Sequence, residues 1–104
     1  MKSFSLIALA TTAALAAPAV SFASPELAQK KNCMACHATD KKLVGPSYKD
    51  VAAKYAKDKD AVKKLAEKII KGGSGVWGPV PMPANAQVNP AEAEQLAKWV
   101  LTVK

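Results

Sequence analysis

The chain has 104 residues and a formal net charge of +7, from 15 basic and 8 acidic side chains. This length allows one domain and no more. All the basic residues are lysines, and the absence of arginine argues against a nucleic-acid-binding protein, in which arginine is the main reader of base edges. A charge of this size concerns solubility and encounters with acidic surfaces, not the fold.

The first 23 residues have the pattern of a secretory signal peptide. Met1 and Lys2 form a short basic start, residues 4–20 are mostly small and apolar, and Ser21-Phe22-Ala23 is a plausible cleavage site. The apolar run is too short and too rich in alanine for a membrane span, which needs about 20 strongly apolar residues. We therefore predict a signal peptide over residues 1–23 and a periplasmic domain over residues 24–104, without stable membrane insertion.

The exported part predicts an all-α fold with about four short helices. The first is expected over residues 25–36, with Ser24 as its cap and Pro25 in its first turn. The second is expected over residues 47–56, because apolar side chains recur there at helical spacing, at Tyr48, Val51, Ala52 and Tyr55. No apolar stripe is left over for a second subunit, so a monomer is predicted.

Two further helices follow. One is expected over residues 61–71, with Asp60 as its cap, an apolar stripe opposite an arc of lysines that includes Lys68, and a glycine pair as its stop. The last is expected from Pro90 to the end of the chain, after a capping-box-like start at Asn89. Its stripe is expected to be buried, with Trp99 at the edge. The connection over residues 72–88 is long for so small a domain, which predicts a functional loop.

The only two cysteines stand three positions apart. A disulfide between them would close a loop too small to stabilise a domain of this size, which ordinarily needs some further element to complete its core. Cys33-Met34-Ala35-Cys36-His37 is C-x-x-C-H, the attachment motif of c-type haem. The two thiols add to the two vinyl groups on one edge of the porphyrin, and one helical turn supplies that span. His37 is then carried under the ring, where its imidazole reaches the iron.

Two other chemistries use similar motifs. A thioredoxin-like C-x-x-C is expected within a βαβ pattern, and the sequence has none. A structural zinc site needs four ligands, whereas Cys33, Cys36 and His37 supply three and no second cluster follows. One covalently bound haem c explains the motif and also completes the core.

The second axial ligand is sought among His, Cys, Met and Tyr. His37 is the only histidine, and both cysteines are used by the vinyl groups. Met34 lies inside the attachment loop, on the wrong side of the ring. Tyr48 and Tyr55 fall on an apolar helical stripe and are expected in the core. Met82 remains, unless the sixth position is open or held by a lysine.

Met82 lies in Pro79-Val80-Pro81-Met82-Pro83, where prolines can hold the backbone rigidly without offering donors. An iron with both His and Met bound has no open position for a substrate, which favours a one-electron carrier over an enzyme. Two alternatives are a haem enzyme or gas sensor with an open sixth position, and a structural or metal-binding secreted domain. The lysine-rich surface is expected to speed encounters with acidic partners, and salt to slow them.

The exported part resembles the small bacterial class I cytochromes c of the c-551/c-552 type. Three segments carry this resemblance beyond the haem motif: VGPSYKDVA over residues 44–52, GVWGPVPMP over residues 75–83 and LAKWVL over residues 96–101. The resemblance implies the class I cytochrome c fold wrapped round one haem and a role in a respiratory chain. It also implies redox partners: a quinol–cytochrome c reductase as donor, and nitrite reductase, a terminal oxidase or a peroxidase as acceptor.

The same resemblance implies roles for several residues around the iron pair of His37 and Met82. The Pro46 carbonyl would accept a hydrogen bond from His37, Trp77 would donate to a haem propionate, and Asn85 would bond near the Met82 sulfur. Lys68 stands where relatives place a basic propionate partner, although the helix pattern puts it on a solvated face. Two positions differ from close relatives: Ala84, where a proline is common, and Ala28, where some carry a bulky aromatic residue.

Overall fold

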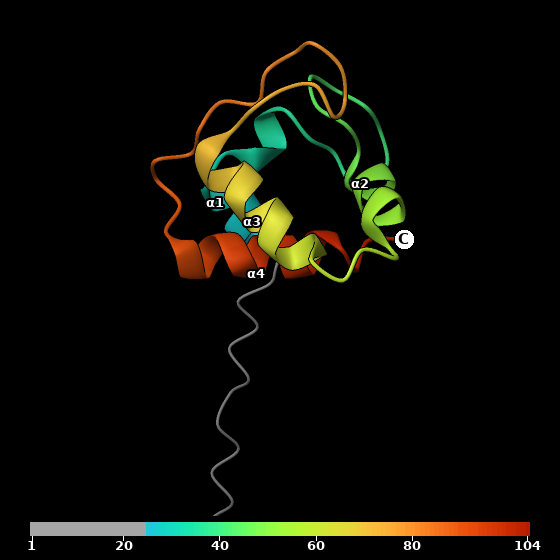
Figure 1. Ribbon diagram of the computed structural model, residues 1–104. Coiled ribbons are helices and arrows are strands. Elements are labelled where there is room, and N and C mark those ends of the chain that lie inside the picture. Colours follow the sequence, from blue (N-terminus) through green and yellow to red (C-terminus); the bar gives the residue numbers. More distant parts are fainter. Residues whose placement is uncertain (1–24) are drawn as a thin grey trace, which may run out of the picture.

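The computed structural model describes residues 25–104, so the predicted signal peptide lies outside the described residues. The order of elements is α1 (Pro25–Lys30), a short 3₁₀ helix η1 (Cys33–Ala35), α2 (Tyr48–Tyr55), α3 (Ala61–Lys71) and α4 (Pro90–Val100). The all-α prediction is confirmed, since extended pairing over these residues is limited to an isolated bridge between Gly73 and Met82. Figure 1 shows the loop between α3 and α4 arching across the top of the molecule. None of the helices from residue 25 onward is long and apolar enough to span a bilayer.

The first predicted helix, over residues 25–36, is wrong as one continuous element. The chain leaves α1 after Lys30, and Asn32 takes a left-handed conformation with φ 64°, which asparagine tolerates better than most residues. A new turn then begins at Cys33, whose carbonyl accepts hydrogen bonds from the amides of Cys36 and His37 at 3.2 and 3.1 Å. The C-x-x-C-H motif therefore occupies a tight turn of its own.

The predicted capping of α3 by the side chain of Asp60 is also wrong. Asp60 has φ −101° and ψ 15° and makes no side-chain cap bond, because an N-cap side chain reaches the helix from an extended backbone. Asp60 still occupies the N-cap position, and the carboxylate of Asp58 supports this end of the helix: one oxygen accepts from the Asp60 amide at 2.8 Å and the other pairs with Lys64 at 2.7 Å. The predicted stop is confirmed, since α3 ends at Lys71 and the Gly72 amide bonds back to the Lys68 carbonyl.

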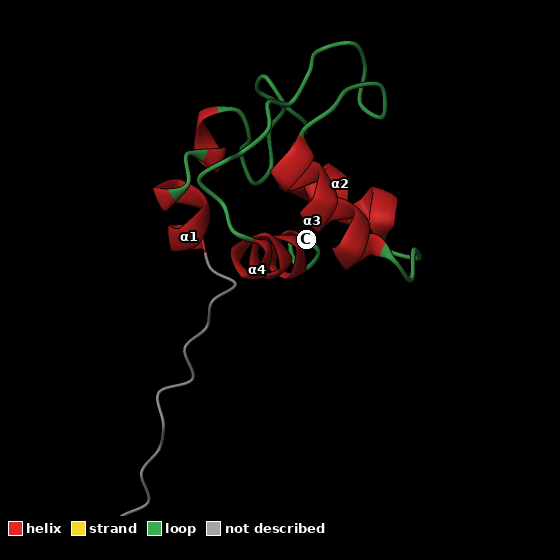
Figure 2. Cartoon of the chain, turned by 60° about the vertical axis from the view of Figure 1, so that its left-hand side comes forward, coloured by secondary structure: helices red, strands yellow, loops and turns green. Residues whose placement is uncertain are grey.

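Helix α4 forms the floor of the core. The predicted capping box is present: the Asn89 side chain accepts from the Glu92 amide at 2.8 Å, and the Glu92 side chain accepts from the Asn89 amide at 3.1 Å. The helix ends at Val100, short of the predicted end of the chain. It packs most extensively against α3 and also contacts α1 and α2. In Figure 2, α4 lies between α1 on one side and α3 with α2 on the other.

The core holds mainly small and branched side chains, with two aromatic rings among them. Ala28 on α1 is fully buried, and this small side chain allows α1 to lie close to α4. Trp99 is buried with 9% exposure, which corrects its predicted place at the edge of the stripe. Its ring meets that of Tyr48 edge-on at 5.1 Å, so α2 and α4 are joined by an aromatic contact.

Candidate haem site

His37 is oriented by backbone on two sides. Its Nδ1 atom lies 2.7 Å from the Pro46 carbonyl oxygen, the acceptor that the resemblance implied. Because a carbonyl only accepts, Nδ1 carries the proton and Nε2 keeps its lone pair for a metal. Gly45 lies directly against the ring: a Cβ there would be 2.5 Å from the Cε1 atom of His37. The Gly45 amide also donates to the Cys36 carbonyl at 2.7 Å, which fixes this approach.

A buried tyrosine supports the imidazole. The ring of Tyr48 stacks on that of His37 with centroids 5.0 Å apart and planes at 21°. Tyr48 is 6% exposed, which confirms its predicted place in the core, and Tyr55 is partly buried against the same core. The imidazole thus has a packed ring beside it, and an ordered ring loses little entropy when it binds a metal.

Cys33 and Cys36 form no disulfide, and both are half-buried. Burial raises the pKa of the Cys33 thiol, and a hydrogen bond with the Tyr48 hydroxyl works in the opposite direction. Burial, together with the nearby Cys33, likewise raises the pKa of Tyr48 well above its ordinary value. Since the thiolate is the form that oxidises and exchanges disulfides, a raised pKa favours the less reactive neutral thiol at Cys33 before haem is attached.

Met82 is held by backbone pairing from the far end of α3. The amide of Met82 donates to the Gly73 carbonyl at 2.8 Å, and the Gly73 amide donates to the Met82 carbonyl at 2.9 Å. Gly72, with φ 69°, makes the turn into this bridge, and a Cβ there would collide with the Met82 carbonyl oxygen. The backbone of the loop that carries the Met82 thioether is therefore hydrogen-bonded to the residues that directly follow α3.

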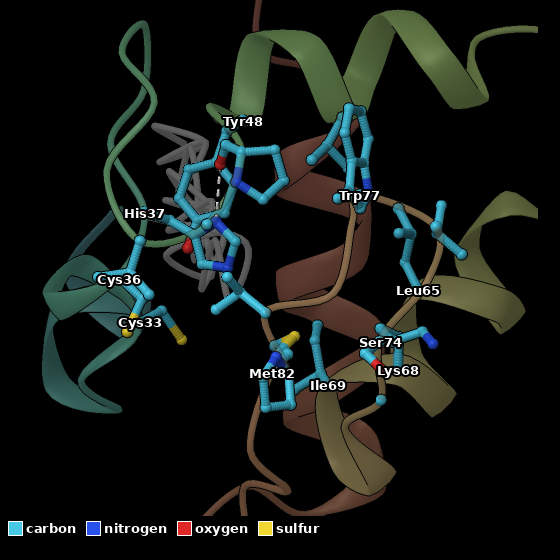
Figure 3. Close-up of a pocket in the computed structure, with 18 of the residues that line it drawn as sticks. Cys33, Cys36, His37, Tyr48, Leu65, Lys68, Ile69, Ser74, Trp77 and Met82 are labelled. Carbon is cyan, nitrogen blue, oxygen red and sulfur yellow. Dashed lines mark hydrogen bonds between the residues drawn. The ribbon is translucent and has the colours of Figure 1, made fainter.

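These groups surround one cavity of about 310 Å³. Figure 3 shows Cys33, Cys36, His37 and Met82 around the same space, with Leu65 and Ile69 of α3 completing an apolar wall. Two thiols and an imidazole from one turn, a thioether from a distant loop and walls that are mostly apolar are the donors and surroundings that a haem requires. The residues present therefore fit a covalently attached haem.

The polar residues at the cavity come from α3 and the loop. Lys68 is half-buried and lines the cavity, so its predicted place on a solvated face is wrong, because the loop folds back beside α3. Trp77 lines the cavity with 43% exposure. The Asn85 side chain donates to the carbonyls of Ile69 at 2.8 Å and Pro83 at 3.3 Å, and its contact with the Met82 sulfur stays a prediction.

Sequence reasoning missed two contributors. Gly45 lies within residues 44–52, one of the segments that carry the resemblance, and a glycine just before the acceptor Pro46 is a signal for close backbone approach. Lys54 of α2 places its Nζ atom 5.4 Å from the centre of the Trp77 ring. No sequence signal links Lys54 to Trp77, because they meet only after the loop has folded over.

Comparison with known proteins agrees with this geometry. The family model for cytochrome c matches residues 23–104. The chain is 55% identical to cytochrome c-552 of Hydrogenobacter thermophilus and 51% identical to cytochrome c-551 of Pseudomonas aeruginosa, each over the full length of both chains. The crystal structure of wild-type cytochrome c552 from Nitrosomonas europaea, 54% identical, matches with a TM-score of 0.76 and covers 78% of this chain and 100% of that chain.

Proposed function

Because this chain belongs to the cytochrome c family, with the class I fold and one covalently bound haem c, and is an electron carrier rather than an enzyme, we propose that His37 and Met82 are the two axial ligands of its iron. We propose further that Cys33 and Cys36 form the thioether bonds and that the carrier serves a periplasmic respiratory chain.

The observation that carries this proposal is the shared cavity. His37, with Nε2 left to accept a metal, and Met82, with its backbone bridged to Gly73, both line it although they are 45 positions apart. Met34 belongs to the attachment turn η1. Met34 is not among the residues that line the cavity, whereas Met82 is.

When bound, the haem supplies a one-electron iron couple, and the protein determines how that couple behaves. The Pro46 carbonyl holds the proton on Nδ1 of His37, which fixes the tautomer and makes Nε2 a stronger ligand. A Met82 thioether in the sixth position excludes water and other ligands. Apolar walls keep solvent out, and Lys68 and Trp77 are suited to hold the haem carboxylates. Because hydrogen bonds hold both His37 and the backbone of Met82, the positions of these two ligands would change little when the iron is oxidised or reduced.

Partner docking is proposed at the mouth of the cavity. Four apolar side chains that are about half exposed line the cavity, namely Val44, Val76, Trp77 and Val80. Lys42 and Lys68 line it as well. We propose a quinol–cytochrome c reductase as donor and nitrite reductase, a terminal oxidase or a peroxidase as acceptor. The rate of electron transfer to an acidic partner should fall as ionic strength rises, and a salt-independent rate would rule out steering by lysine.

The visible spectrum of the purified protein tests the ligand assignment. We expect a low-spin spectrum, a weak Met–iron band in the oxidised form and no change when carbon monoxide is added to the reduced form. Met82→Ala should abolish the weak band and allow carbon monoxide to bind. A wild-type protein that binds carbon monoxide would instead favour the alternative of a haem enzyme or gas sensor with an open sixth position.

The proposed boundary has a separate test. The protein recovered from the periplasm of an expressing cell should begin at Ser24 and have the mass of residues 24–104 plus one haem. It should also sediment as a monomer. A protein that keeps residues 1–23 and partitions with membranes would show that this segment is an anchor.

A further inference from the structure

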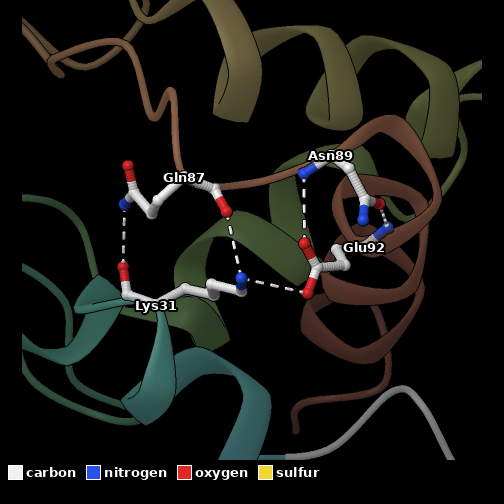
Figure 4. A network of polar contacts seen from close by, with 4 residues as sticks. All are labelled: Lys31, Gln87, Asn89 and Glu92. Carbon is white, nitrogen blue, oxygen red and sulfur yellow. Dashed lines mark hydrogen bonds and ion pairs between the residues drawn. The ribbon is translucent and has the colours of Figure 1, made fainter.

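Gln87 joins the segment before the haem motif to the loop that carries Met82. Its side-chain Nε2 donates to the Lys31 carbonyl at 3.0 Å and to the Asn85 side-chain oxygen at 3.1 Å. The backbone carbonyl of Gln87 accepts a hydrogen bond from the Lys31 ammonium group at 3.0 Å. The same ammonium group pairs with Glu92 at 3.1 Å. Figure 4 shows Lys31 and Gln87 exchanging hydrogen bonds in both directions. Lys31 stands two positions before Cys33, so Gln87 connects the two sides of the cavity.

The contact with Asn85 has a directional consequence. An asparagine amide can sit in either of two orientations that exchange its donor and its acceptor. With Gln87 donating to it, the oxygen of Asn85 faces Gln87 and the nitrogen faces the carbonyls of Ile69 and Pro83. The opposite orientation would put an oxygen against those two carbonyls and lose all three bonds.

We propose that Gln87 is a positioning residue for Met82. By fixing the orientation of the Asn85 amide, it ties Pro83, the residue after Met82, to the end of α3, and it anchors the same loop to Lys31. This inference rests on the proposed function, because it takes Met82 as an iron ligand. The Gln87 side chain is exposed and does not line the cavity, so it acts on Met82 through hydrogen bonds rather than through packing.

The test measures how readily an outside ligand displaces Met82. Cyanide is titrated into the oxidised, haem-loaded protein, and the Met82 methyl resonance is followed in the reduced protein. Gln87→Ala should raise the apparent cyanide affinity by about tenfold, the size of one or two net hydrogen bonds. Gln87→Glu keeps the size of the side chain but removes the donor, so it should behave like Gln87→Ala.

The matched control is Gln29→Ala, since Gln29 is an exposed glutamine on α1 whose side chain makes no hydrogen bond within residues 25–104. It should leave the cyanide affinity unchanged. A merely structural role would lower the unfolding midpoint of both Gln87 variants without changing cyanide affinity at temperatures where they are folded, and that result would overturn the proposal.

The wild-type protein gives a second readout that does not depend on the variants folding. The side-chain amide protons of Gln87 and Asn85 should exchange with solvent more slowly than those of Gln29, and equal rates would contradict the proposed bonds. A wild-type protein that lacks the Met–iron band would refute the ligand assignment itself. An intact band with identical cyanide affinity in wild type and Gln87→Ala would refute the role of Gln87 alone.

Discussion

The two sides of the cavity are built in different ways. On the histidine side, the contacts are local: His37 bonds to Cys33 four positions earlier and to Pro46 nine positions later. On the methionine side, the pairing of Met82 with Gly73 also spans nine positions, but the bonds of Asn85 with Ile69 and of Gln87 with Lys31 reach across 16 and 56 positions. The histidine side can thus form from one short segment, whereas the methionine side needs α1, α3 and the loop together.

This difference indicates where the site is most easily disturbed. Contacts between distant segments are lost when any of those segments opens locally, whereas contacts within one short segment persist as long as that segment stays folded. We therefore expect Met82 to be released before His37 as the protein is destabilised. Backbone substitutions at each side of the cavity provide the first tests of this order of release.

The largest effect is expected from Gly72→Ala on the methionine side. Gly72 has φ 69° and ψ −162°, a region that only glycine occupies readily, and a Cβ there would meet backbone atoms of Met82, Pro83 and Ala84. Backbone strain and overlap together should lower the unfolding free energy by on the order of 4 kcal/mol. Urea unfolding measures this loss, and the Met–iron band should weaken before the protein unfolds.

Gly75→Ala is the matched control for Gly72→Ala. Gly75 also has a positive φ, of 103°, but a Cβ there would meet nothing within 4 Å. The loss of unfolding free energy in Gly75→Ala should be limited to backbone strain, about 1–3 kcal/mol. If both variants lose the same stability, the close approach of Gly72 to the Met82 backbone contributes nothing.

A smaller loss is expected from Gly45→Ala on the histidine side. The clash is with the side-chain ring of His37, whose Cε1 atom would lie 2.5 Å from the new Cβ, so the ring has to move and the cost should be about 1–3 kcal/mol. The shift would lengthen the bond to Pro46 and should change the reduction potential while the Met–iron band persists. Loss of that band in Gly45→Ala at temperatures where it is folded would contradict the separation of the two sides.

The histidine side was also the more predictable one. The C-x-x-C-H motif identified the haem, because covalent attachment dictates the spacing of the thiols, and it provided His37 as the proposed proximal ligand. Three helices were found from local signals: the apolar spacing of α2, the Asn89 capping box of α4 and the glycine after Lys71 at the end of α3. The break at Asn32 was missed, since a single left-handed residue leaves the apolar pattern on either side intact.

What escaped prediction depends on chain segments that meet only in the folded protein. The helical pattern of α3 predicts a solvated Lys68, because such a pattern contains no information about neighbouring segments. Lys68 is half-buried because the loop lies beside it. Asp60 makes no side-chain cap bond because its backbone is not extended, and the sequence does not reveal these backbone angles. The contacts of Gln87 with Lys31 and of Lys54 with Trp77 are of the same kind.

A pH-dependent effect is expected at Glu92, within the network that joins α4 to Lys31. The hydrogen bond from the Asn89 amide, followed by the Lys31 side chain, holds the pKa of this carboxyl below its ordinary value. The folded state therefore binds the proton less readily than the unfolded state, so the stabilisation is complete above the ordinary carboxyl pKa and is lost as pH falls through the lowered one.

Glu92→Gln tests this sign, because a glutamine keeps the acceptor for the Asn89 amide and loses the charge. The unfolding free energies of wild type and variant should differ at pH 7 and converge as pH falls below about 4, near the ordinary carboxyl value. Other groups titrate in both proteins and cancel in the difference. A difference that is constant from pH 7 to pH 3 would show that the charge of Glu92 does not stabilise the fold.

The smallest effect is expected at Lys54, whose ammonium group lies over the exposed face of Trp77. Such a contact stabilises by about 0.5 kcal/mol at an exposed site, so the single variant Lys54→Ala is close to the limit of measurement. A double-mutant cycle with Trp77→Leu isolates the coupling, because losses of helix propensity and charge appear equally in both backgrounds. Lys57→Ala, which removes a lysine just beyond α2, should show no coupling with Trp77. Equal coupling for Lys54 and Lys57 would mean that general charge, and not the contact, links α2 to the loop on the methionine side.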